Sequence, residues 1–144
     1  MGIKDVVKDN WTAANTSSIT PAFSTGWYDV KNVSPQITFT DPEEAAQSSG
    51  PTGYFGMANG TPSQYWIGSI DVNIWVTRED TAVNPKKLVH EFKEEVKRLI
   101  RAKYDDVTGL DFIVWRGGHS TVETDKSPVV YRYAGEVGYG YMTT

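Results

Sequence analysis

The sequence predicts an α+β fold: a mainly antiparallel sheet of about five strands, packed by one long amphipathic helix and a short N-terminal helix. Apolar and polar residues alternate in two long segments, 65–78 and 129–143, as they do in strands. Between these segments, apolar residues recur at helical steps after Asn84 and Pro85. Neither a repeat nor a change of composition divides the chain, so we expect 1–144 to form a single domain.

The first elements are expected to be a helix at 3–14 and two strands at 27–31 and 35–40. The helix is predicted by apolar residues at three- and four-residue steps: Ile3, Val6, Val7, Trp11 and Ala14. The segment PQITFT alternates like a strand, and its connection to WYDVK is short. We therefore expect these two strands to pair in the antiparallel sense.

The segment 65–78 gives the clearest strand pattern. One set of alternate side chains is apolar: Ile70, Val72, Ile74 and Val76. The other set contains Asp71, Asn73 and Trp75. We expect the first set to face the core and the second to face water or a partner, which makes Trp75 a candidate interface residue.

The long helix is expected to run from Pro85 to about Tyr104, because Asn84 and Pro85 form a strong helix start. Its apolar stripe comprises Leu88, Val89, Phe92, Val96, Leu99 and Ile100. After a turn at 105–109 we expect a strand at 110–116, a polar loop at 117–127 and a final strand at 129–143.

A long flexible loop is predicted at about 41–64, and its part SSGPTGYFGMANGTPSQ (48–64) has no charged residue. It does carry Tyr54, Phe55 and Met57. Aromatic residues and Met are enriched in interface cores, where charges are depleted. We therefore predict that these three residues contact a partner; the alternative is a loop that folds back on its own sheet.

The net charge of −4 is unevenly distributed. Residues 1–80 hold 4 basic and 9 acidic side chains (−5), and residues 81–144 hold 10 and 9 (+1). This balance argues against a strongly basic nucleic-acid binder. Lys86 and Lys87 stand where they oppose the helix dipole, which slightly favours contact with an outside partner; the alternative is a solvated helix face with intrahelical ion pairs.

The final strand has more aromatic residues of one parity than a small core can cover, among them Tyr139 and Tyr141. The opposite parity holds small residues, including Gly138 and Gly140, which allow another backbone to approach. A terminal strand is also a template for pairing between subunits. We predict that Tyr139 and Tyr141 contact a partner, with core packing as the alternative.

Catalytic and metal-binding patterns are weak. His90 falls on the charged side of the helix, and His119 falls in the predicted Gly-Gly turn near Ser120 and Thr121 without a spacing that enforces a hydrolytic site. The carboxylates at 41–44 and 105–106 lack the alternation of a calcium loop. The chain has no cysteine and no apolar run long enough to cross a membrane. We expect no enzyme activity, no cofactor, no metal and no membrane partner.

The ordered set of features resembles a family. PQITFT is followed by a long polar segment, the strand GSIDVNIWV, the helix LVHEFKEEVKRLIR, the strand GLDFIVWR and the aromatic phrase YRYAGEVGYGY. This pattern is similar to the tail terminator (tail completion) proteins of long-tailed phages and related archaeal viruses. The similarity covers nearly the whole chain.

The resemblance implies a structural virion protein that forms a ring, usually of six copies, at the head-proximal end of the tail tube. Such a ring ends tube polymerisation and joins the neck, so the implied partners are further copies of itself, the tail tube protein and a neck or connector protein. DNA is expected to pass through the ring without sequence-specific binding. The implied location is the tail–neck junction of the virion, after assembly in the host cytoplasm. The alternatives are another neck or head-completion protein, a cellular binding module, or a hydrolase that uses His119.

Overall fold

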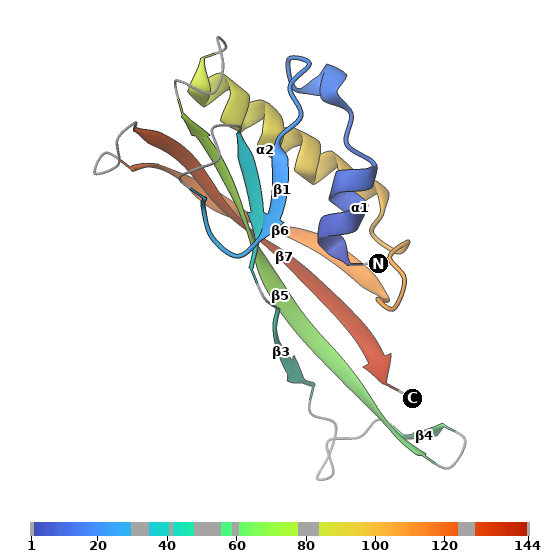
Figure 1. Ribbon diagram of the computed structural model, residues 1–144. Coiled ribbons are helices and arrows are strands. Elements are labelled where there is room, and N and C mark those ends of the chain that lie inside the picture. The colour runs from blue at the N-terminus through green and yellow to red at the C-terminus, as the bar shows by residue number, and fades with distance from the viewer. Residues whose placement is uncertain are drawn as a thin grey trace.

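The computed structural model describes residues 2–29, 35–40, 42–47, 56–58, 61–77, 84–123 and 129–143, with the backbone alone at 56–58, 61–62 and 123. Its elements, in chain order, are α1 (Ile3–Asp9), the 3₁₀ turn η1 (Ala13–Asn15), β1 (Ala22–Thr25), β2 (Gln36–Phe39), β3 (Glu43–Ala46), β4 (Gly56–Ala58), β5 (Thr61–Thr77), α2 (Pro85–Ala102), β6 (Phe112–Glu123) and β7 (Val130–Thr143). Both α-helices lie on one face of a long twisted sheet (Figure 1).

The sheet is mixed, and the predicted α+β fold class is confirmed. Five strands follow each other in the order β1-β2-β5-β7-β6, and β3 and β4 pair with the N-terminal part of β5. All pairs are antiparallel except β1 with β2, which are parallel.

The predicted antiparallel pair of strands 27–31 and 35–40 is wrong in its first member. The strand is β1, at Ala22–Thr25, and it ends where Gly26 takes a φ of +107°, which L side chains rarely adopt. Trp27 then turns toward Trp75 on the sheet face that the helices do not cover. Residues 30–34, which include the end of the predicted strand, lie outside the described residues.

The long helix confirms the prediction. The Asn84 side chain accepts a hydrogen bond from the Lys86 backbone N–H at 3.0 Å, and Pro85 occupies the first turn. The predicted apolar stripe is buried, with Phe92 fully inaccessible. It packs in one core cluster with Ile70, Val72, Ile74 and Val76 of β5. The core-facing half of the predicted alternation is therefore correct.

Strand β6 continues through most of the predicted polar loop at 117–127. A bulge between Trp115 and Gly117 shifts its register against β7, and Gly117 has a φ of +99°. Pairing then resumes as far as Glu123. The prediction of a loop was wrong here because backbone pairing with the long β7 holds polar residues and glycines in a strand.

The segment 41–64 is not one continuous loop. It contains β3, β4 and the first residues of β5, which begins at Thr61 and not at 65. Strand pairing uses backbone groups, so residues without an apolar alternation, such as the Glu-Glu-Ala-Ala of β3, can pair with a long partner strand. Positions 41, 48–55, 59 and 60 lie outside the described residues.

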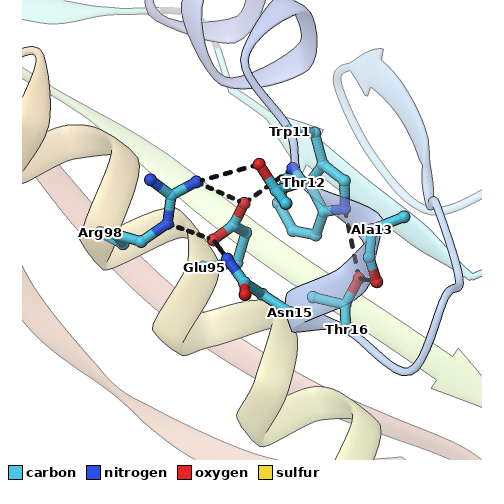
Figure 2. Close-up of polar contacts among 7 residues, drawn as sticks. All are labelled: Trp11, Thr12, Ala13, Asn15, Thr16, Glu95 and Arg98. Carbon is cyan, nitrogen blue, oxygen red and sulfur yellow. Dashed lines mark hydrogen bonds and ion pairs between the residues drawn. The ribbon is translucent and has the colours of Figure 1, made fainter.

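The N-terminal helix ends at Asp9, earlier than predicted, and the chain that follows it is fixed to α2 by a buried carboxylate. Glu95 accepts hydrogen bonds from the Thr12 backbone N–H at 2.8 Å and from Asn15 Nδ2 at 3.0 Å. Arg98 donates to both of its oxygens, at 2.6 and 2.8 Å (Figure 2). Burial acts to raise the pKa of Glu95, but the bonds from Arg98, Asn15 and Thr12 outweigh it and lower the pKa below its usual range.

None of the described helices is long and apolar enough to cross a membrane.

Truncating the buried aromatic ring of α2 tests the core. Phe92→Ala should reduce the free energy of unfolding by about 3–5 kcal/mol, because it leaves a cavity between helix and sheet. Chemical denaturation measures this change. His90→Ala, at an exposed position of the same helix, is the control and should change stability little. A loss in Phe92→Ala no larger than in the control would show that the ring is not in the core.

Removing the charge of Glu95 should change how stability depends on pH. A lowered folded pKa means that the ionised group stabilises the fold above its unfolded pKa of about 4.3, and that this contribution is lost as the pH falls through the folded pKa. Glu95→Gln should therefore lower stability at neutral pH by roughly 1–3 kcal/mol and flatten the acid limb of the stability–pH curve. Glu94→Gln, in an exposed ion pair of the same helix, should have a much smaller effect. Equal acid limbs for wild type and Glu95→Gln would contradict this assignment.

Candidate interaction surface

The sheet extends beyond its helix-covered core as an arm, comprising β3, β4, residues 61–68 of β5 and residues 141–143 of β7. Figure 1 shows β5 and β7 running past both helices, with β3 and β4 beside this extension. Toward this end of the sheet, the last fully packed core residues are Ile70 and Tyr139. Beyond them Tyr65, Trp66 and Ile67 remain partly accessible, and Met142 is 41% exposed. The arm thus presents apolar side chains that no described helix covers, as interaction surfaces do.

Two of the predicted interface residues meet at the base of the arm. The Tyr139 hydroxyl donates to Glu44 Oε2 at 2.6 Å, and the Tyr141 hydroxyl donates to Glu44 Oε1 at 2.7 Å. The two rings are stacked, with centroids 6.3 Å apart. Tyr139 lies across Gly68, where an added Cβ would come within 2.6 Å of the ring. One carboxylate of β3 is therefore tied across β5 to two phenols of β7.

The carboxylate changes the acid–base behaviour of both phenols. Burial, and then the hydrogen bond and charge of Glu44, raise the pKa of Tyr139 far above its usual range. The hydrogen bond to Glu44 is the main cause that raises the pKa of Tyr141. Both groups therefore remain neutral hydrogen-bond donors at physiological pH.

Tyr139 is buried, with 4% of its surface exposed, so the prediction that it offers a partner contact is wrong in the single chain. Tyr141 is half-buried and borders a hollow of about 370 Å³ at the base of the arm. The hollow is mostly apolar, and its lining includes Ile3, Phe39, Pro42, Ile70 and Leu110. It is the size of a few side chains, and Tyr141 with Glu44 forms its polar edge.

The prediction that Trp75 faces water or a partner is also wrong in the single chain, because its side chain is 0% exposed. On the sheet face away from the helices, Trp27 packs edge-on against it and Tyr28 stacks on it. The Arg132 guanidinium lies 4.6 Å from the Trp27 ring and 4.7 Å from the Trp75 ring. The residue exposed at this place is Trp27, at 56%.

The remaining predicted residues fall in different parts of the chain. Lys86 and Lys87 are exposed on the first turn of α2, at the end of the sheet opposite the arm, and Lys87 pairs with Glu91 at 4.0 Å. Met57 belongs to β4 on the arm, where the backbone alone is described. Tyr54 and Phe55 lie outside the described residues, so their predicted contact with a partner stays a prediction.

Sequence reasoning assigned no role to Glu44, Trp66, Met142 or Trp27. The length of the alternating pattern in the sequence could have predicted the arm. Strands β5 and β7 have 17 and 14 residues, and α2, which covers them, has 18. Because a strand rises about 3.3 Å per residue and a helix 1.5 Å, one helix of this length cannot cover such strands.

A catalytic arrangement is not apparent among the described residues. His119 is exposed on β6, not in a turn, and borders a polar hollow of about 410 Å³ with Asp71, Arg116 and Glu136. Within this hollow Arg116 pairs with Glu136 at 3.7 Å. His90 is exposed on α2, and the described residues contain no group of three metal-ligating side chains.

Comparison of the chain with models of known protein families gives no match, and comparison with curated proteins gives none either.

Glu44→Gln tests the link between β3 and β7. With the carboxylate removed, the pKa of Tyr139 and Tyr141 should fall toward the usual value of about 10. A raised phenol pKa stabilises the fold fully below the unfolded pKa, and this stabilisation is lost as the pH rises through the folded pKa. Absorbance of tyrosinate during an alkaline titration should show phenols that ionise earlier in Glu44→Gln. Glu43→Gln, on the other face of β3, should leave the titration unchanged; an identical curve for Glu44→Gln would exclude the assigned link.

Proposed function

We propose that this chain is a structural subunit of a viral tail, which assembles as a ring at the head-proximal end of the tail tube, ends tube polymerisation and joins the neck. The observation that carries the proposal is the arm, because it exposes strands and apolar side chains well outside the helix-covered core. Such a projection is costly for an isolated subunit but serves contact with neighbours. The order of elements and the sequence resemblance to tail terminator proteins support the same assignment.

The chemistry of the described surface supports an assembly role over a catalytic one. Its most constrained polar groups hold parts of the fold together: Glu95 ties the N-terminal segment to α2, and Glu44 ties β3 to β7. Neither is arranged with a nucleophile or a metal-binding group within the described residues. These hydrogen-bonded carboxylates, Glu95 buried and Glu44 exposed, give rigidity, which a ring subunit needs to present repeated contacts at fixed angles.

In a ring, each subunit makes heterologous contacts through two different surfaces. This chain has two unlike ends: the arm, with its apolar and acidic residues, and the opposite end with the exposed lysines of α2. The proposed partners are further copies of the chain, the tail tube protein on one side of the ring and a neck or connector protein on the other. DNA then passes through the opening without sequence-specific contacts, and the protein is located at the tail–neck junction after assembly in the host cytoplasm.

Electron microscopy of the purified full chain tests the proposal directly. We expect closed rings with a central opening, usually of six copies, and we expect added rings to stop the growth of tail tubes in vitro. A chain that remains monomeric at high concentration and has no effect on tube length would overturn the proposal.

The aromatic pair that precedes β4 gives a matched mutational test. Replacing Tyr54 and Phe55 together with Ser should weaken ring formation and leave the melting temperature of the isolated subunit nearly unchanged, because the pair is expected to be buried only on assembly. Val129→Ser, at an exposed apolar position near the other end of the sheet, should change neither property. A large loss of subunit stability with normal rings would place the pair in the subunit's own core.

A further inference from the structure

Strand β6 forms one outer edge of the sheet, and no described strand pairs with its outer side. Near its start, the Ile113 backbone N–H donates to the Tyr104 carbonyl at 2.7 Å, so the turn after α2 covers the first residues of this edge. Within the described part of the chain, the edge beyond this bond, as far as Glu123, is open to pairing. An open edge of this length is a template for a strand from another chain.

The helix side of this edge is basic. Four cations of α2 lie in a row along this side of the sheet: Lys86 lies near residues 120–122, Lys97 and Arg101 border a groove with residues 112–115, and Lys93 lies over the Tyr133 ring of β7. Arg98 also lines the groove, but its charge is paired with Glu95. Glu94 is the acidic side chain among them, and it pairs with Lys93 and Lys97 at 3.4 and 3.5 Å. Four cations and one carboxylate leave a net charge of +3 along the row. We name the open edge together with this row the basic edge.

The groove beside the basic edge has a volume of about 1000 Å³ and a largely apolar floor, with Ile100, Ile113 and Trp115 among its lining residues. On the other face of β6, the side chain of Arg116 is 44% exposed and pairs with Glu136 at 3.7 Å. Cations therefore stand on both faces of the edge strand. A partner strand with acidic side chains on both of its faces would meet a cation on either side.

The chain itself has such a strand. All residues of β3 are exposed, and no described strand pairs with its outer side. Its sequence, EEAA, places Glu44 on the face toward the helices and Glu43 on the opposite face, where Asp71 lies near it. The small Ala45 and Ala46 let a second backbone approach. We name this strand the acidic edge.

We propose that neighbouring copies join by pairing the acidic edge of one copy with the basic edge of the next, so that the sheet continues from subunit to subunit. The two edges differ in chemistry, and each lacks a described partner within its own chain. This contact is heterologous: each copy gives its acidic edge to one neighbour and its basic edge to the other. Such contacts generate a closed ring when the rotation between copies closes. The inference rests on the proposed function, since it assigns the contact between subunits of the ring.

Cross-linking tests the contact cleanly, because the natural chain has no cysteine. Ala45→Cys and Ser120→Cys, combined in one chain, place a thiol on each edge at exposed positions. A short bismaleimide should link the assembled protein into a ladder of covalent oligomers, whereas either single variant should give no species above a dimer. The control combines Ser120→Cys with Ala14→Cys, an exposed position in η1, and should give no ladder.

Charge reversal gives a second, independent measurement. Lys97→Glu with Arg101→Glu should weaken self-association by at least about tenfold in analytical ultracentrifugation and should reduce its dependence on salt. Lys4→Glu with Lys8→Glu on α1 changes the net charge equally and should leave the association nearly intact. Circular dichroism establishes that each variant is folded.

The two proposals fail in different ways. Rings that form normally, without a ladder in the double-cysteine variant and without weakening by the charge reversal, would overturn the edge contact and leave the proposed function standing. A ladder with the Ala14→Cys control as strong as that with Ala45→Cys would also overturn the edge contact. Absence of self-association in the unmodified chain would overturn both proposals.

Discussion

Strand β5 is the element on which the rest of the structure depends. It has 17 residues and pairs with β2 and β3 along one edge and with β7 along the other. Its first residues also pair with β4, and its apolar face packs against α2. Backbone pairing can continue for the full length of a strand, but one helix covers only part of that length. The same strand therefore supports the core at one end and the arm at the other.

Two hydrogen-bonded carboxylates connect elements that backbone pairing does not join. The side chain of Glu95 is fully buried between α2 and the N-terminal segment, a costly position for a carboxylate without partners. Hydrogen bonds from Thr12, Asn15 and Arg98 satisfy it and fix the N-terminal segment on the helix. Glu44 has the corresponding role for β3, with two phenols as donors. In both cases a carboxylate on one element specifies the position of a segment distant in sequence.

Different side-chain contacts cover the two faces of the sheet. On the helix face, aromatic rings of the sheet pack on glycines: Trp115 lies over Gly135, where an added Cβ would come within 2.3 Å of its ring. On the opposite face, where no helix is described, Trp27 and Tyr28 cover Trp75 beside Arg132. This second arrangement explains why the strand face that carries Asp71, Asn73 and Trp75 is only partly exposed to solvent. Asp71 is exposed, while Asn73 and Trp75 are inaccessible.

The sequence by itself determined the fold class, the limits of α2 and the core face of β5, because a cap and the periods of strand and helix are local properties. Phe92 and Val72 were assigned correctly for this reason. Only the tertiary structure decided the parallel pairing of β1, the extension of β6 and the burial of Trp75 and Tyr139. Each of these depends on a distant partner: β2 for β1, β7 for β6, Trp27 for Trp75, and Glu44 with Gly68 for Tyr139. Residue type and spacing do not specify such partners, so the exposed interaction surface follows from the arrangement of the strands and not from the pattern along any one of them.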